Sequence, residues 1–214
     1  MRNEVWHMGK AFSEEERIQV QQKLRKIGLR LFADKGIKGV SIREVTKAAE
    51  IAQGGFYTFY KDKTDFLIDL MEVRIKEKLE ILKEQAGDSL EDPMQYMADT
   101  FFKQGVHLTK NKAFDNMLSG SVELFFNTEF SVQEHLGKYY LEYMSFMIHL
   151  WRENGYQVEM SDTMFTAAIR ITGVMISNAS LIEEDQFDKI YRSFCDGVVS
   201  TFLKVEKSNR DAEQ

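Results

Sequence analysis

Apolar side chains recur every three or four positions over most of the chain, and short polar breaks separate these stretches. This period is typical of amphipathic helices, whereas the strict alternation expected for strands is scarce. Only one proline, Pro93, is available to interrupt a helix. The pattern predicts an all-α protein with about nine helices. Their ranges are 13–35, 41–49, 53–59, 62–85, 93–109, 112–126, 131–154, 161–182 and 185–206.

Capping signals mark the ends of several predicted helices. Gly36 and Gly155 each follow an apolar stretch, and glycine at that place is typical of a helix C-terminus. Asp62 is expected to cap the fourth helix, and Pro93 suits the first position of the fifth. Three Ser-x-x-Glu motifs have the spacing of a capping box, in which both side chains bind backbone amides of the first turn. They are Ser13 to Glu16, Ser41 to Glu44 and Ser131 to Glu134.

The predicted helices fall into a short N-terminal set and a longer C-terminal set. The polar stretch 87–93 is the clearest candidate for a linker, and the long fourth helix precedes it. We therefore predict two domains, residues 13–74 and residues 75–207, connected through the fourth helix. With 214 residues the chain is long enough to bury a substantial apolar core.

The net charge of −6 is unevenly distributed. Residues 17–63 contain 11 lysines and arginines against 4 acidic residues, whereas the rest of the chain contains 17 against 30. A basic segment in an otherwise acidic chain favours a nucleic-acid partner for that segment. Basic helix faces are often only solvated, however, so the charge alone does not establish a nucleic-acid partner, and a sequence motif is needed as well.

The first three predicted helices have the lengths of a helix-turn-helix unit. In that unit a longer helix supports two short ones, and the second short helix enters the major groove of DNA. Gly54 and Gly55 each cost about 1 kcal/mol of helix propensity relative to alanine. Their place at the start of the second short helix indicates a close approach of its backbone to another surface, for which DNA is the natural choice.

Helical positions counted from Gln53 divide this second short helix into two faces. The positions expected to face inward are aromatic, and those expected to face outward are polar or small. The inward set is Phe56, Phe59 and Tyr60. The outward set is Gln53, Gly54, Tyr57 and Thr58. In the outward set, glutamine suits a base edge and threonine suits a thymine methyl group.

Three runs of sequence together resemble the N-terminal domain of the tetracycline-repressor (TetR) family, over about residues 17–74. They are LFADKG at 31–36, SIREV at 41–45 and GGFYTFYKDK at 54–63. The resemblance implies a homodimeric transcription regulator, commonly a repressor that a small-molecule effector releases from double-stranded operator DNA. It also implies phosphate contacts at Ser41, Arg43, Tyr57 and Lys63. The complete set of predicted DNA-binding residues is Ser41, Arg43, Gln53, Gly54, Gly55, Tyr57, Thr58, Lys61 and Lys63.

Three positions depart from the pattern of that family. Glu50 stands in the turn between the two short helices, where the family usually has a glycine, and it adds a negative charge near the DNA. Ala52 and Phe59 stand where a serine and a histidine usually flank the recognition helix. A helix cap and a phosphate donor are therefore missing. The predicted class is unchanged, but the operator sequence does not follow from these residues.

The C-terminal half is rich in aromatic residues and methionine. Helical bundles pack their cores with such side chains, so most of them are expected to be core. The functional alternative is a cavity for a small, largely apolar effector, lined by adaptable side chains and a few polar groups. The candidate pocket residues are Phe101, Phe102, His107, Met117, Phe125, Tyr140, Tyr143, Met144, Met147, Trp151, Phe165, Met175 and Asn178.

Apolar and small residues alternate along the last two predicted helices, which favours close helix approach at a dimer interface. Packing inside a monomer is the alternative explanation. A dimer is preferred because a single helix-turn-helix contacts few bases, and two-fold dimers that span two half-sites are the common solution. The candidate interface residues are Ile169, Thr172, Gly173, Ile176, Phe194, Gly197, Val198 and Thr201.

Other classes of function are disfavoured. The four histidines lack the spacing of a metal site, Cys195 has no activating signature beside it, and no glycine-rich phosphate loop occurs, so we predict no enzyme, metal or cofactor. The richest apolar stretch, 164–182, is interrupted by Arg170 and Asn178 and is not expected to span a membrane. A single cysteine favours a reducing cytoplasm. The remaining alternative is a helical ligand- or protein-binding module of the same fold without ligand-regulated repression.

Overall fold

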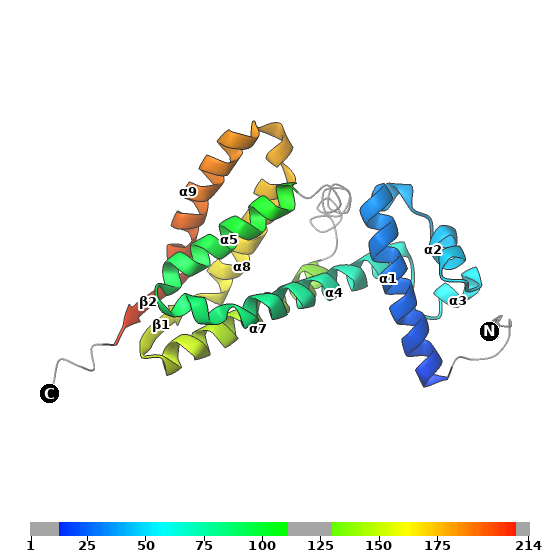
Figure 1. Cartoon of the computed structure of the whole chain (residues 1–214), viewed down its shortest axis with the longest axis horizontal. Coiled ribbons are helices and arrows are strands. Elements are labelled where there is room, and N and C mark those ends of the chain that lie inside the picture. Colours follow the sequence, from blue (N-terminus) through cyan, green and yellow to red (C-terminus); the bar gives the residue numbers. More distant parts are fainter. Residues whose placement is uncertain (1–12, 111–129, 209–214) are drawn as a thin grey trace.

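The computed structural model describes residues 13–110 and 130–208, and within them the chain is mainly helical. In chain order the elements are α1 (Glu14–Gly39), α2 (Ile42–Ala48), α3 (Gln53–Phe56), α4 (Lys63–Glu84), the 3₁₀-helix η1 (Ala86–Leu90), α5 (Pro93–Lys110), α7 (Phe130–Glu153), β1 (Tyr156–Met160), α8 (Asp162–Ser177), the 3₁₀-helix η2 (Ala179–Leu181), α9 (Glu184–Phe202) and β2 (Leu203–Lys207). The helices α1, α2 and α3 gather at one end, the C-terminal helices gather at the other, and α4 runs between them (Figure 1). The all-α prediction is confirmed, and the helix expected at 112–126 lies outside the described residues.

α1 begins as its capping signal predicts, but it does not stop at Lys35, because the helix continues to Gly39 after a kink at Gly36. The hydroxyl of Ser13 accepts from the amide of Glu16 at 3.2 Å, and the Glu16 carboxylate accepts from the amide of Ser13 at 2.7 Å, which completes the capping box. Near the C-terminal end, Gly36 leaves the helical conformation with φ 69°, a value that glycine adopts without strain. The apolar stripe of α1, with Leu24 and Phe32 buried, faces the other N-terminal helices.

The buried apolar residues form two separate clusters that share α4. The first cluster joins α1, α2 and α3 to the beginning of α4 and ends at Leu70. The second begins at Leu79 and joins the remainder of α4 to the C-terminal helices. Leu70 and Leu79 are nine positions apart in α4, or about 13 Å along its axis. Within the first cluster, α1 approaches α4 closely at Gly28, where a Cβ would lie 2.4 Å from the ring of Phe66.

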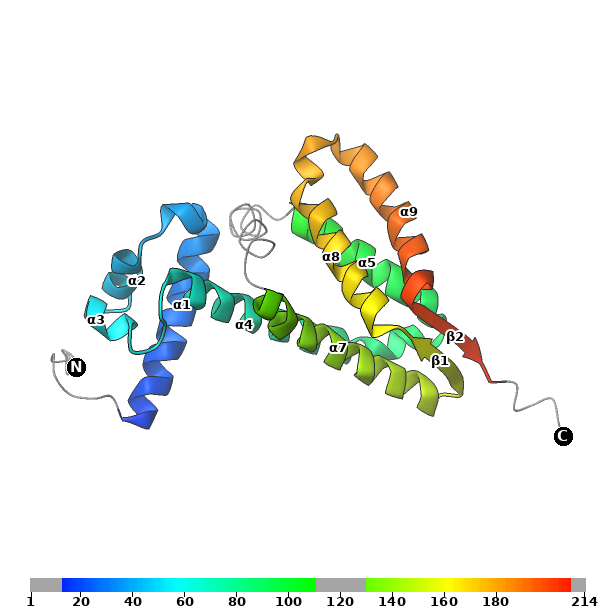
Figure 2. The same cartoon turned by 180° about the vertical axis from the view of Figure 1, so that it is seen from behind.

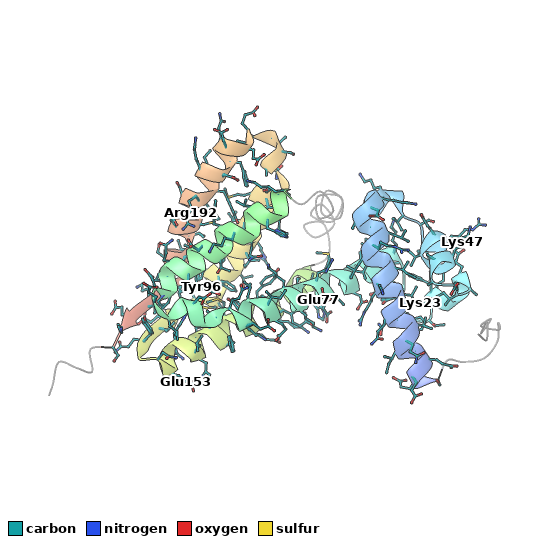
Figure 3. The ribbon with its side chains drawn as sticks, viewed as in Figure 1. Lys23, Lys47, Glu77, Tyr96, Glu153 and Arg192 are labelled. Atoms are coloured by element: carbon teal, nitrogen blue, oxygen red, sulfur yellow. The ribbon has the colours of Figure 1, made fainter. Side chains whose placement is uncertain are left out.

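The stretch predicted as a linker is a packed turn. Residues 86–90 form η1. Aromatic side chains from three other elements donate hydrogen bonds to η1 or to Gln85, the residue before it. Trp151 donates its indole N–H to the hydroxyl of Ser89 at 2.7 Å, and Tyr156 donates to the carbonyl of Leu90 at 2.6 Å. Tyr96 at the start of α5, labelled in Figure 3, donates to the carbonyl of Gln85 at 3.4 Å. α4 is thereby fixed at its C-terminal end.

Tyr191 of α9 lies at the centre of the C-terminal helices. Its ring stacks on Phe187 at a centroid distance of 5.3 Å, and its hydroxyl donates to the carbonyl of Phe101 on α5 at 3.0 Å. α5 has a glycine where the two helices are closest, because a Cβ on Gly105 would lie 2.2 Å from the Tyr191 oxygen. The glycine and the tyrosine therefore set the spacing between α5 and α9.

A small antiparallel sheet, which the sequence pattern did not predict, joins the ends of α7 and α9. β1 pairs with β2 in a register that places Val158 opposite Val205 (Figure 2). The last helix was expected to reach residue 206, but α9 ends at Phe202 and the next five residues pair with β1. The prediction was wrong there because strand pairing over residues 203–207 depends on a partner about 45 residues earlier. Gly155, with φ 84°, ends the α7 segment as predicted.

Candidate nucleic-acid interface

α2 is held to α1 at its N-terminal end. The hydroxyl of Ser41 accepts from the amide of Glu44 at 3.2 Å, which is the expected N-cap. The carboxylate of Glu44 pairs with Lys35 on α1, so the predicted capping box is only half formed. The Lys35 ammonium also lowers the pKa of Glu44 below its usual value. Ser41 and Arg43 themselves are exposed on the surface of this unit.

α3 is a single turn, shorter than the predicted range of 53–59. It ends at Phe56 and is followed by turns, in which the amide of Phe59 donates to the carbonyl of Phe56 at 2.9 Å. The two glycines and the uncapped Ala52 explain the short length, since they lower helix propensity and leave the first turn without a side-chain cap. The division into two faces is as expected. Phe56 and Tyr60 are buried and Phe59 is half-buried, whereas Gln53, Gly54, Tyr57 and Thr58 are exposed.

Aromatic rings fix α3 on the first turns of α4. Phe56 meets Phe66 edge-on at 5.4 Å between centroids, and Tyr60 lies 4.7 Å from the same Phe66 ring. The hydroxyl of Tyr60 donates to Asp69 at 2.7 Å, and burial together with this bond raises the pKa of Tyr60. Arg25 of α1 forms two hydrogen bonds to the Asp69 carboxylate, at 2.5 and 2.8 Å. The Arg25–Asp69–Tyr60 network was not predicted from the sequence, because no local spacing links residues so far apart.

Glu50 occupies the turn between α2 and α3 with a positive φ of 57°. A side chain with a Cβ is strained in this region, which is where glycine is favoured. The Glu50 carboxylate accepts from Lys23 of α1 at 2.9 Å, and the lysine lowers the pKa of Glu50 (Figure 3 labels Lys23). The turn is therefore formed despite the departure from glycine, and the extra negative charge is paired with a cation.

The predicted cations at the beginning of α4 differ in their surroundings. Lys63 is partly buried, lies 5.8 Å from the ring centroid of Phe32 and donates to the carbonyl of Val40 at 2.5 Å. Burial lowers the pKa of Lys63. This side chain connects α4 to the residue before Ser41, so it has a structural role that the sequence did not indicate. Lys61 is exposed in the loop before α4.

Most of the predicted pocket residues belong to the packed core of the C-terminal helices. Phe101, Tyr143, Met144, Met147, Trp151 and Phe165 are buried; Phe102, Tyr140 and Met175 are half-buried; His107 and Asn178 are exposed. Met117 and Phe125 lie outside the described residues. Asn178 donates to the carbonyl of Val174 at 2.8 Å and so caps its own helix.

Two buried hydroxyl groups in this region lack a hydrogen-bond partner among the described residues. They belong to Tyr143 of α7 and Thr172 of α8. Burying a hydroxyl without a partner is costly, and a water or a ligand can supply the missing bond; Tyr143 lies beside Tyr96, and Thr172 lies beside Tyr191. A shallow hollow of about 290 Å³ occurs elsewhere, and none of the predicted pocket residues lines it. Its lining residues are Ser145, Ile148, His149, Arg152, Met160 and Asp162.

The predicted interface residues of α8 are turned partly inward. Ile169, Thr172, Gly173 and Ile176 are half-buried, as are Phe194 and Val198 of α9, whereas Gly197 and Thr201 are exposed. The large apolar side chains that α8, η2 and α9 expose lie at other positions. They are Met164 (44%), Ile171 (51%), Val174 (42%), Leu181 (78%), Ile182 (42%) and Ile190 (56%). An uncovered apolar surface therefore exists on these helices, beside the predicted stripe.

The N-terminal group has the geometry of a helix-turn-helix unit: a long supporting helix, a short helix capped at Ser41, a tight turn at Glu50, and a second short helix with a polar outer face. Residues 25–70 match the family model described as bacterial regulatory proteins, tetR family. The resemblance of this part of the chain to the tetR family is confirmed.

Relatives with curated descriptions match the chain over a similarly short length. The chain is 31% identical over 61 residues to the HTH-type transcriptional regulator AcrR of Shigella flexneri, covering 28% of each protein. It is 37% identical over 51 residues to the transcriptional regulator AcuR of Cereibacter sphaeroides, covering 24% of this chain and 23% of that protein. The similarity thus spans about a quarter of the length of these relatives.

Solved structures share the fold over almost the whole chain. RolR in complex with resorcinol has a TM-score of 0.67 and 20% identity, with 89% of this chain and 90% of that chain covered. A TetR transcriptional regulator from Rhodococcus sp. RHA1 has a TM-score of 0.64 and 15% identity, with 87% and 98% covered. At these identities the comparison establishes the fold, including that of the C-terminal helices.

Replacing Glu50 by glycine is expected to raise the melting temperature by about 2–4 °C, because glycine adopts the positive φ of this turn without strain. Thermal unfolding followed by circular dichroism measures the change. Glu50→Ala is the matched control: it also removes the carboxylate that pairs with Lys23 but retains a Cβ, so no rise is expected. A glycine variant that melts no higher than the parent would contradict the presence of strain.

Proposed function

We propose that this chain is a DNA-binding transcriptional regulator that places α3 and the following turn, residues 53–58, in the major groove. The observation that carries the proposal is the two-sided character of this segment. Phe56 is fully buried against α4, whereas Tyr57 beside it is 52% exposed and its polar neighbours face solvent. A segment fixed by buried aromatic rings and polar on its outer face is suited to reading a groove. The family match over residues 25–70 supports this assignment.

Individual side chains of this surface suit different parts of DNA. Gln53 is exposed and has the donor and acceptor needed for a base edge. The hydroxyl of Thr58 already donates to the carbonyl of Gly55 at 2.7 Å, which leaves its methyl group for a thymine. A Cβ on Gly54 would meet no atom within 4 Å among residues 13–110 and 130–208. The protein itself does not require a glycine there, so close approach of a partner is the better explanation.

Phosphate contacts are assigned to the groups around this segment. Ser41, Arg43, Tyr57 and Lys61 are exposed, and their hydroxyl and cationic groups suit phosphate oxygens. Lys63 is included with these residues, although its hydrogen bond to the carbonyl of Val40 also gives it a structural role. The excess of basic residues over 17–63 favours this end of an acidic chain for DNA. We propose residues 13–74 as the DNA-binding domain and residues 75–207 as the effector-binding and dimerisation domain.

We further propose that α8 and α9 form the interface of a homodimer. The apolar side chains of Ile171 and Val174 on α8 and of Ile190 on α9 are exposed, and burying them against a partner is favourable. Gly197 and Thr201 on α9 are exposed and small, which permits a partner helix to approach. Two copies paired through these helices would present two DNA-binding domains to two half-sites.

A small, largely apolar effector is proposed to bind among α5, α7 and α8 and to release the protein from its operator. The buried hydroxyl groups of Tyr143 and Thr172, without partners among the described residues, supply polar groups for such a ligand. RolR, which has a similar fold, was solved with resorcinol, a ligand of this size and character. A ligand acts by binding one spacing of the two DNA-binding domains more tightly than the other. Repression in the cytoplasm is the expected mode of action.

A second candidate function is a helical ligand- or protein-binding module of the same fold that does not regulate transcription. No helix among residues 13–110 and 130–208 combines the length and apolarity that crossing a membrane requires. The two functions differ in one measurable property, because only a regulator prefers a particular DNA sequence in addition to its salt-dependent attraction to phosphates.

Variants of the recognition surface are expected to separate base readout from phosphate binding. Gln53→Ala and Thr58→Ala should each reduce discrimination between operator and scrambled DNA by about 1–3 kcal/mol where the side chain reads a base, with little change in salt dependence. Lys61→Ala should weaken binding to all sequences and lower the salt slope by about 0.9 for each phosphate that is no longer neutralised. Tyr57→Phe tests the hydroxyl alone.

The measurement is fluorescence anisotropy at several salt concentrations, on a duplex that the parent protein selects from random sequence and on its scrambled counterpart. Lys103→Ala on α5 is the matched control, since it also removes an exposed cation but lies far from α3, and it is expected to bind like the parent. If every folded variant at the recognition surface binds operator like the parent, the assignment of α3 to the major groove is wrong.

The parent protein is expected to sediment at twice its chain mass of 24.9 kDa. Ile171→Glu and Val174→Glu place charges in the proposed interface and are expected to give monomers at micromolar concentration, because burying an unpaired carboxylate is costly. Ile81→Glu alters an equally exposed isoleucine on α4 and should remain dimeric. Dimers in all three variants would exclude this face of α8 from the interface.

An effector found by thermal-shift screening of small phenols and apolar acids is expected to weaken operator binding by about 5–150-fold. Tyr143→Phe removes the buried hydroxyl without changing the ring, so this variant should fold like the parent and respond to the same compound at higher concentrations. Tyr156→Phe, which removes a hydroxyl bonded to Leu90, is the control with an unchanged ligand response. Stabilisation by a compound that leaves operator affinity intact would identify a ligand that is not an inducer.

A further inference from the structure

Arg17, in the first turns of α1, lies against the segment that follows α3. Its guanidinium carbon is 5.3 Å from the ring centroid of Phe59, although the two residues are 42 positions apart in the sequence. Phe59 directly follows the exposed pair Tyr57 and Thr58. The beginning of α1 and α3 both lie in the group of helices remote from the C-terminal domain (Figure 1). Arg17 is therefore a cation beside the recognition surface that sequence analysis did not select.

The surroundings of Arg17 differ from those of other arginines in the described part of the chain. Arg25, Arg74 and Arg192 each form an ion pair with a carboxylate of the protein. Arg17 is exposed and is positioned by an aromatic ring, and within residues 13–110 and 130–208 no carboxylate lies at ion-pair distance from it. The nearby Glu16 carboxylate is engaged instead by the backbone amide of Ser13.

A guanidinium that lies over a ring is orientated without losing its hydrogen-bonding capacity. Its five N–H groups point outward in the plane of the group, where they match two oxygens of a phosphate. The side chain of Phe59 has no hydrogen-bond donor of its own. The arginine above it supplies a cationic donor at that place from a different helix.

We propose that Arg17 binds a phosphate of the DNA backbone beside the recognition helix, with Phe59 as the residue that positions it. The ligand class is the phosphodiester of double-stranded DNA. This inference rests on the proposed function and extends the protein's contact with DNA to α1. The competing explanation is that Arg17 only stabilises the packing of α1 on the helix-turn-helix, and it predicts a change in stability without a change in salt dependence.

The test compares Arg17→Gln with Arg30→Gln on the full-length protein. Arg30 is an exposed arginine on the same helix, 13 residues or about 20 Å further along its axis. Arg17→Gln is expected to weaken binding to a duplex selected by the parent about three- to thirty-fold per dimer and to lower the salt slope by about 1.8, for one phosphate in each half-site. Preference over a scrambled duplex should not change, and Arg30→Gln should bind like the parent.

The positioning role of Phe59 is tested by a double-mutant cycle. Phe59→Leu keeps an apolar side chain but removes the ring, and it should lose part of the affinity that Arg17→Gln loses. The double variant should lose no more than Arg17→Gln alone, because the ring acts through the arginine. Arg17→Lys retains the charge and should retain most of the salt slope. Additive losses from the two single variants would overturn the positioning role of Phe59.

Melting temperatures and the recognition-surface variants distinguish the remaining outcomes. If Arg17→Gln lowers the melting temperature but leaves the salt slope unchanged, Arg17 is a packing residue and the inference is wrong. If Arg17→Gln binds like the parent while Tyr57→Phe and Lys61→Ala bind more weakly, the inference fails and the proposed function stands. If none of these variants alters binding, the proposed function fails as well.

Discussion

α4 is one continuous helix that takes part in two separate hydrophobic cores, and the rest of the structure depends on this sharing. Leu70 is the last residue of α4 buried in the core of the N-terminal helices, and Leu79 is the first residue of α4 buried in the core of the C-terminal helices. A flexible linker would allow the two parts to move independently, whereas a helix with buried side chains at both ends transmits its orientation directly. The contacts at η1 fix one end of α4, and the contacts of Phe66 and Asp69 fix the other.

The acidic residues of the N-terminal helices show how an interface for a polyanion tolerates carboxylates. Glu44 pairs with Lys35, Glu50 pairs with Lys23, and Asp69 pairs with Arg25. Each pair joins α1 to a later element, so the same contacts that organise the unit also neutralise these three carboxylates. Cations such as Arg43 and Lys61 then dominate the field at the surface assigned to DNA.

Local signals in the sequence predicted the helices well wherever they determine the conformation. The cap at Ser13, the positive φ at Gly36 and Gly155, and the helix begun by Asp62 follow from short-range chemistry. Features that depend on distant partners were missed. β2 needs β1, and the 87–93 stretch is ordered by Trp151 and Tyr156, so neither follows from local composition.

The candidate site shows the same limit. The inward and outward faces of residues 53–60 followed from helical spacing, even though α3 itself is only one turn. The bond from Lys63 to Val40 and the position of Arg17 over Phe59 join residues far apart in sequence, so no motif indicated them. In the C-terminal helices a methionine or aromatic residue has the same pattern whether it fills a core or lines a cavity. The predicted pocket residues therefore remain a hypothesis.

Because α4 is long, a small rearrangement at its C-terminal end, beside η1, produces a larger displacement at its N-terminal end. Its 22 residues span about 33 Å, so a tilt of about 5° around η1 moves Lys63 by about 3 Å. That displacement is close to the 3.4 Å rise between successive nucleotides of one DNA strand. A change too small to disturb the packing around Trp151 would therefore shift the recognition segment by about one base step, and in a two-fold dimer the change in spacing would be doubled.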